Sequence, residues 1–160
     1  MGAYRQTSRF SQVHVSLVRQ PGGAIGVGIV CRTRNGVNVV KLAYVSSRLT
    51  AGEALYEGVL TALEEAAHNG VRGLTVYLDS PQAVNELNRR SPVAPALQPL
   101  YIQVRCQANA LGRVRFELAG RHQNFAARRL ARAALVGRKP IHIEYDNALL
   151  PLRIPEEAAA

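Results

Sequence analysis

The segment from Leu49 to Arg90, LTAGEALYEGVLTALEEAAHNGVRGLTVYLDSPQAVNELNRR, decides the fold. Apolar residues at helical spacing predict a helix from about Gly52 to His68, which Thr50 caps and the Asn69-Gly70 pair ends. A short apolar run follows and closes on Asp-Ser, and a second helix then begins at a proline. This order predicts an α/β domain with Asp79 at the C-terminal end of a buried strand, where open α/β sheets place their ligands.

The flanking sequence completes a mixed sheet. Upstream, three strand signals cover residues 13–18, 24–34 and 36–47, and the Asn35-Gly36 pair between the last two is typical of a hairpin turn. Downstream, the pattern predicts a helix over about 97–110, a strand over 114–118, and a last helix from Asn124, its cap, to about Leu135. The element order β-β-β-α-β-α-α-β-α favours a mixed α/β sheet with helices on both faces.

The chain of 160 residues suits one folded domain with two flanking segments. We expect a basic N-terminal tail over residues 1–11, the domain over residues 12–139 and a C-terminal extension over residues 140–160. The extension alternates in I-H-I-E-Y, so it either adds a strand or wraps the domain. The two cysteines, Cys31 and Cys106, are expected to be buried, reduced thiols.

Composition excludes a membrane protein and points to a polyanionic partner. No apolar run approaches the roughly 20 residues that span a bilayer, and the N-terminus lacks a signal-peptide pattern, so we predict a cytoplasmic protein. The 20 basic residues outnumber the 11 acidic ones, and residues 1–50 contain seven bases and no Asp or Glu. Residues 101–139 hold nine bases against the single Glu117. Nucleic acid is the usual partner of such a surface.

Four segments resemble, in order and spacing, the type I ribonuclease H family. They are P-G-G-A-I-G-V-G-I-V, L-T-A-G-E-A-L-Y-E-G-V-L-T-A-L, V-Y-L-D-S-P-Q-A-V-N-E-L, and the stretch from P-L-Y-I-Q-V-R through L-A-G-R-H-Q-N-F-A-A-R-R-L-A. The resemblance implies a ribonuclease H-like mixed five-stranded sheet, in which a three-strand antiparallel meander is followed by parallel strands. It also implies cleavage of the RNA strand of RNA–DNA hybrids by two magnesium ions that four carboxylates hold.

Carried onto this sequence, the four acid positions of the family retain a single acid, Asp79. The other three positions fall on His14 or Ser16, on Leu55, and on Arg128. Glu53 and Glu57 lie two residues either side of Leu55, on a different face of the helix. We therefore predict a catalytically degenerate protein with no metal site and no cofactor, in which Mg²⁺ or Mn²⁺ would act only if the chain is active after all.

Asp79, the one candidate catalytic residue, also has a structural interpretation. An Asp-Ser pair at a strand end before a proline is a common helix cap. Without metal partners, capping of the helix that begins at Pro81 is favoured over catalysis, and Ser80 could share the cap.

Arginines in the C-terminal half are the candidate nucleic-acid contacts. Arg113 and Arg115 alternate on one strand and should share a face, while Arg121, Arg128 and Arg132 recur at seven- and four-residue intervals along the last helix and its approach. Arg128 and Arg132 are expected to be exposed. The predicted contacts are Arg113, Arg115, Arg121, Arg128, Arg129, Arg132 and Arg138.

The partner is predicted to be a duplex or an RNA–DNA hybrid, bound with weak sequence preference. Aromatic residues are few and most are expected in the core, so contacts to backbone and groove shape should outweigh base stacking. Two alternatives stay open. One is an active, metal-dependent ribonuclease H with a displaced site built from Asp79 with Glu53, Glu57, His14 or Asp146. The other is a protein–protein interaction module or homodimer that uses an exposed sheet edge.

Overall fold

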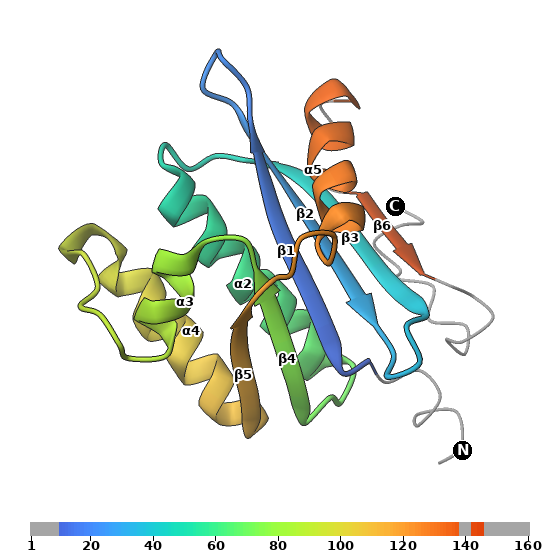
Figure 1. The fold of residues 1–160 in the computed structure, drawn as a ribbon, viewed down its shortest axis with the longest axis vertical. Helices are drawn as coiled ribbons and strands as arrows, with labels where there is room; N and C mark the ends of the chain where they lie inside the picture. The colour runs from blue at the N-terminus through green and yellow to red at the C-terminus, as the bar shows by residue number, and fades with distance from the viewer. Residues whose placement is uncertain (1–9, 138–141, 146–160) are drawn as a thin grey trace.

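Three antiparallel strands and two parallel ones form the sheet that the sequence predicts. The computed structural model of the chain describes residues 10–137 and 142–145. The strands β1 (Gln12–Arg19), β2 (Ile25–Arg32) and β3 (Asn38–Ser46) form the meander, and β4 (Gly73–Leu78) and β5 (Arg113–Leu118) join it in parallel. The strand order in the described part is β5-β4-β1-β2-β3-β6 (Figure 1).

The sixth strand settles one open alternative. β6 (His142–Tyr145) pairs antiparallel with β3, so this part of the predicted C-terminal extension adds a strand to the sheet. The remainder of the predicted extension, residues 146–160, and residues 1–9 of the predicted basic tail lie outside the described residues.

The helices cover both faces of the sheet, as predicted. They are α2 (Ala51–His68), α3 (Pro81–Leu87), the short 3₁₀ turn η1 (Pro95–Leu97), α4 (Gln98–Leu111) and α5 (Phe125–Gly137). Thr50 caps α2 by accepting a hydrogen bond from the backbone N–H of Glu53 at 3.2 Å, and Gly70 after it has a φ of 71°. In Figure 1, α5 lies across one face of β1, β2 and β3, and α2 lies behind the sheet.

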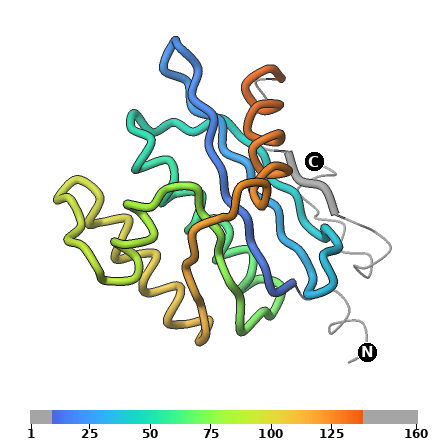
Figure 2. The backbone as a smooth tube through the Cα atoms, in the orientation of Figure 1, coloured from blue at the N-terminus to red at the C-terminus, as the bar shows by residue number. Residues whose placement is uncertain are grey.

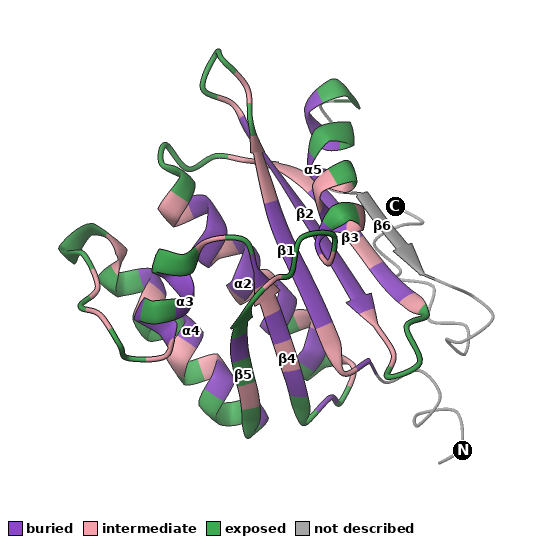
Figure 3. Ribbon diagram, viewed as in Figure 1, coloured by how far each residue is buried: buried purple, intermediate pink, exposed green. Residues whose placement is uncertain are grey.

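Two glycines on β2 let α5 lie directly on the sheet. A side chain at Gly26 would overlap the carbonyl oxygen of Ala131, and one at Gly28 would overlap that of Ala127. The residues of α5 that turn inward are small or apolar and buried, whereas its outer face is exposed (Figure 3). On the opposite face, Gly58 of α2 packs against the side chains of β1 and β2. Residues on one face of β1 therefore lie under α5, which positions the site described below.

Gly28→Ala should destabilise the fold strongly. The new methyl group would meet helix backbone, which cannot move aside without displacing α5, so we expect a loss of roughly 3 kcal/mol in unfolding free energy. Gly22→Ala is the matched control, because nothing lies within 4 Å of the added carbon. Urea unfolding measures both variants. Equal stability of Gly28→Ala and the wild-type protein would contradict this packing.

Among the described residues, no helix combines the length and apolarity that a bilayer crossing requires. The cysteine prediction is half right. Cys31 is buried on β2, where burial raises the pKa of its thiol well above the ordinary value, but Cys106 on α4 is exposed.

Candidate nucleic-acid interface

The parallel pairing of β1 with β4 places Ser16 beside Asp79. Val15 pairs with Leu78 in the register, so the next residue of each strand lies at the same edge of the sheet. The Ser16 hydroxyl donates a hydrogen bond to Oδ2 of Asp79 at 2.5 Å, and Ser16 is buried. The sequence leaves His14 and Ser16 as candidates for the first acid position. Ser16 is the one that lies beside Asp79, and His14 is two residues earlier on β1.

A cation completes this cluster from the other side. Nη2 of Arg128, on α5, lies 3.4 Å from the same Oδ2 of Asp79. The Arg128 side chain, predicted to be exposed, is 41% exposed, and it forms the ion pair with Asp79 across its inner side. Half-exposed pairs of this kind contribute about 1 kcal/mol or less to stability. The contact therefore matters more for where it holds the guanidinium than for the fold.

The preferred structural role of Asp79 is also wrong. Ser80 is the N-cap of α3, because its hydroxyl accepts a hydrogen bond from the backbone N–H of Ala83 at 3.2 Å. The carboxylate of Asp79 points instead toward Ser16 and Arg128. Asp and Ser are both suitable N-cap residues. Here Ser80 caps the helix, because the Asp79 carboxylate has other partners.

Asn124 ties the start of α5 to two strands. Its Nδ2 donates to the carbonyl oxygens of Val15 at 3.0 Å and Tyr77 at 3.1 Å, and its Oδ1 lies 2.9 Å from Nδ1 of His14. Because the amide nitrogen is already the donor, Oδ1 must accept, and the proton of neutral His14 therefore lies on Nδ1. The side chain predicted to cap α5 thus anchors the helix to β1 and β4. In Figure 2 the connection from β5 to α5 can be traced across β4 and β1.

His14 is buried with one ring nitrogen unpaired. Its ring stacks on Tyr77 with centroids 4.9 Å apart, and Nε2 has no hydrogen-bond partner among the described residues. Burial lowers the pKa of His14 below its ordinary value of 6.5, the bond to Asn124 opposes this, Arg32 lowers the pKa further and Asp79 raises it. A proton on Nε2 would create a buried charge without an acceptor.

Stability should therefore depend on His14 at mildly acidic pH. The folded state binds this proton less readily than the unfolded state, so stability is full above pH 6.5 and falls as the pH drops toward the lowered pKa of the folded protein. The urea midpoint of the wild-type protein should decline between about pH 7 and 5, and His14→Gln should flatten that decline. An unchanged pH profile in the variant would show that His14 does not titrate in this way.

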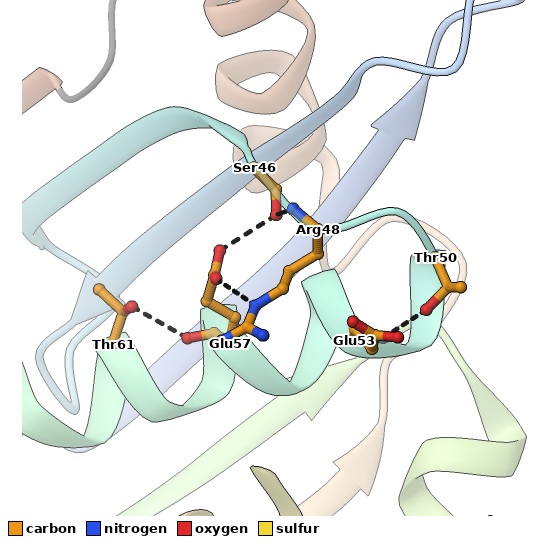
Figure 4. A network of polar contacts seen from close by, with 6 residues as sticks. All are labelled: Ser46, Arg48, Thr50, Glu53, Glu57 and Thr61. Carbon is orange, nitrogen blue, oxygen red and sulfur yellow. Dashed lines mark hydrogen bonds and ion pairs between the residues drawn. The ribbon is translucent and has the colours of Figure 1, made fainter. Parts of the chain in front are cut away.

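The residues at the family's metal position do not fit a magnesium pair. A hydroxyl, one carboxylate and a guanidinium stand where four carboxylates are needed, and a guanidinium repels a cation. Leu55 is buried in α2. In Figure 4, Glu57 turns away to accept hydrogen bonds from Ser46 at 3.1 Å and Arg48 at 2.8 Å, and Glu53 stands over the Thr50 cap.

The described residues offer no group of metal ligands for the alternative of a displaced active site. There, no three His, Cys, Asp or Glu side chains are grouped closely enough to hold a metal ion, and Asp146 lies outside the described residues.

The predicted arginines that the structure describes lie on three consecutive parts of the chain. Arg113 and Arg115 are exposed on β5, which forms one end of the sheet, and Arg121 is exposed on the connection that follows. Arg129 and Arg132 are exposed on α5, beside the partly exposed Arg128. Arg138 lies outside the described residues.

Sequence reasoning missed one exposed aromatic pair. Phe125, one of the few aromatic residues, is 55% exposed, and its ring stacks on that of His122 with centroids 5.4 Å apart and planes 21° apart. The helical spacing of α5 could have predicted that Phe125 is exposed. The buried stripe of α5 runs through Ala127, Ala131 and Ala134, and Phe125 lies about 200° around the helix from Ala127.

The sequence is similar to proteins of a known family. The sequence profile of the family described as reverse transcriptase-like matches residues 12–134. A bifunctional protein of Mycobacterium tuberculosis is 30% identical over 115 residues, which are 71% of this chain and 32% of that protein. An uncharacterized protein of Mycobacterium bovis matches over the same length with the same identity. The chain thus spans about a third of the length of the curated relatives that it matches.

Solved structures agree on the fold. The N-terminal ribonuclease H domain of the Mycobacterium tuberculosis protein is 26% identical, with a TM-score of 0.70 over 79% of this chain and 95% of that one. Ribonuclease H1 from Halobacterium salinarum is 22% identical, with a TM-score of 0.73 over 79% and 97% of the two chains. LC11 ribonuclease H1, solved in complex with an RNA/DNA hybrid, is 19% identical, with a TM-score of 0.73 over the same shares.

Proposed function

We propose that this chain, which belongs to the reverse transcriptase-like family and has the ribonuclease H-like fold, binds nucleic acid without cleaving it. Its ligand is the phosphate backbone of a duplex or an RNA–DNA hybrid, held with weak sequence preference. The observation that carries the proposal is the ion pair between Arg128 and Asp79. The family resemblance assigns Arg128 to a metal-binding acid position, and the ion pair holds its guanidinium beside Asp79, the one acid retained.

The chemistry of the cluster favours phosphate over metal. A guanidinium offers planar, directed N–H donors that match phosphate oxygens, and it keeps its charge at all physiological pH values. Asp79 engages Arg128 through a single oxygen at 3.4 Å, which leaves other guanidinium donors for a ligand. The buried hydroxyl of Ser16 holds the carboxylate in place. Asp79 thus acts as a positioning residue for Arg128.

The surrounding charge extends this contact over a wider surface. Arg121 on the β5–α5 connection and Arg129 and Arg132 on α5 are exposed, Arg113 and Arg115 are exposed farther along β5, and the chain as a whole carries a net charge of +9. Each phosphate that such residues neutralise releases bound counterions, which drives binding without reading sequence. The hybrid in the LC11 ribonuclease H1 complex, bound by the same fold, supports the choice of ligand class.

Location and domain limits complete the proposal. We place the protein in the cytoplasm, on the grounds of its sequence, with the binding domain over residues 12–139 and β6 contributed by the extension. Homo-oligomerisation through a sheet edge is the alternative role if nucleic acid is not the partner.

Equilibrium binding tests the proposal. In low salt with EDTA, fluorescence anisotropy should show binding of labelled duplex and hybrid, and two unrelated sequences should bind with similar affinity. Binding that appears only with Mg²⁺ would support the metal-dependent alternative. No binding to duplex, hybrid or single strands would reject the proposed function, and sedimentation analysis of the oligomeric state would then test the interaction-module alternative.

A further inference from the structure

The stacked rings of His122 and Phe125, called the aromatic pair below, form an exposed platform that phosphate binding does not explain. His122 lies on the connection between β5 and α5, and Phe125 is the first residue of α5. Stacking covers one face of each ring, yet Phe125 remains 55% exposed and His122 is exposed as well. A flat ring that is already stacked on one face can receive another flat ring on its free face.

Several hydrogen bonds hold the segment that carries the aromatic pair against the sheet. The backbone N–H of Ala119 donates to the carbonyl oxygen of Leu78, the residue before Asp79, at 2.8 Å. The backbone N–H of Gly120 donates to Oε1 of Gln123 at 2.8 Å, which closes the connection on itself. Asn124, between the two rings in sequence, is fixed to β1 and β4 as described above. These bonds fix the backbone on either side of the two rings.

Arginines adjoin the aromatic pair in the chain and along α5. Arg128 and Arg129 follow Phe125 by three and four residues on α5, which places both on the same side of the helix, one turn away. Arg121 directly precedes His122 in the chain and is exposed. Asp79, the acid that the β5–α5 connection adjoins, is ion-paired with Arg128. A ligand that combines a flat ring with negative charge complements this surface, and a nucleotide unit has both.

We infer that the aromatic pair is a stacking subsite for an unpaired nucleobase, next to the arginines that hold the phosphates of the same strand. The inference rests on the proposed function and narrows its ligand. A base inside a blunt duplex has both faces covered by its neighbours, so only a single strand, an overhang or a junction offers a free base. Every base has a π-face, so this subsite adds affinity without sequence preference. The preferred ligand is thus a duplex or hybrid with an unpaired end.

The test compares a blunt duplex with the same duplex carrying a short overhang that contains 2-aminopurine. The wild-type protein should bind the overhang roughly tenfold more tightly than the blunt duplex, and stacking should quench the 2-aminopurine fluorescence. Phe125→Leu, which keeps an apolar side chain but removes the aromatic face, should abolish that preference and the quenching while leaving affinity for the blunt duplex unchanged. Phe125→Tyr should retain both.

Val136→Ala is the matched control, since Val136 is an apolar residue of the same helix, 81% exposed and three turns away. It should bind like the wild-type protein. An overhang preference and quenching that survive Phe125→Leu would overturn the inference, as would an equal loss for blunt and overhang ligands, which indicates a structural role for Phe125. Wild-type binding to both ligands without preference would overturn the stacking subsite alone, whereas binding to neither would overturn the proposed function with it.

Discussion

The double variant Arg128→Ala, Arg132→Ala should bind duplex and hybrid at least about tenfold more weakly than the wild-type protein at low salt. Phosphate-driven binding falls steeply with salt, and each lost phosphate contact flattens the slope of log affinity against log salt by about one unit. The double variant should therefore lose up to about two units of slope. Anisotropy titrations over a salt series measure both quantities, and far-ultraviolet circular dichroism checks that the fold is kept.

The matched control is Arg34→Ala, Arg90→Ala, which removes the same charge from residues outside the predicted contacts. Both residues are exposed, on the β2–β3 turn and just after α3. This control should bind nearly as well as the wild-type protein. Equal losses in the two double variants would mean that net charge attracts nucleic acid to the whole surface, and the localised interface around Arg128 would then be wrong.

The helices and strands could be predicted from local sequence signals, and the structure confirms these signals. Thr50 caps α2, and the glycines of the two hairpins have φ values of 94° and 84°, which few other residues tolerate. The alternating and helical periods indicate which faces are buried, so the elements and the position of Asp79 at a strand end could be predicted, whereas the meander followed by parallel strands was implied by the family resemblance. The pairing of β6 could not, because I-H-I-E-Y carries a strand signal but no sign of which edge it joins.

The site was less predictable because its contacts join residues far apart in the chain. Asp79 looks like a helix cap when only its neighbours are considered, and the side chains that draw it away, Ser16 and Arg128, come from β1 and α5. Asn124 likewise matches a helix cap, but its side chain forms hydrogen bonds with residues of β1 and β4. Local propensity describes what a side chain can do next to its own backbone, and tertiary hydrogen bonds override it where they are stronger.

Wild-type protein should fail to cleave an RNA–DNA hybrid in millimolar Mg²⁺ or Mn²⁺. Two cations about 4 Å apart must be held by several carboxylates, because each cation repels the other. Among the described residues at the family's metal position, Asp79 supplies one carboxylate, Ser16 supplies a hydroxyl, and Arg128 supplies a positive charge. Enzymes commonly accelerate such reactions by more than about a millionfold, so the predicted loss is a difference of many orders of magnitude.

The decisive measurement is therefore hybrid cleavage by purified wild-type protein and by Asp79→Asn, followed on a denaturing gel beside an active ribonuclease H as positive control. The account predicts that neither protein cleaves above the level of a reaction without protein, in Mg²⁺ or in Mn²⁺, under conditions where the wild-type protein is bound to the hybrid. Cleavage that persists equally in both samples would come from a contaminating nuclease and would require further purification before the comparison is repeated. Reproducible cleavage by the wild-type protein that disappears in Asp79→Asn would contradict the central claim and show that Asp79 serves a working metal site.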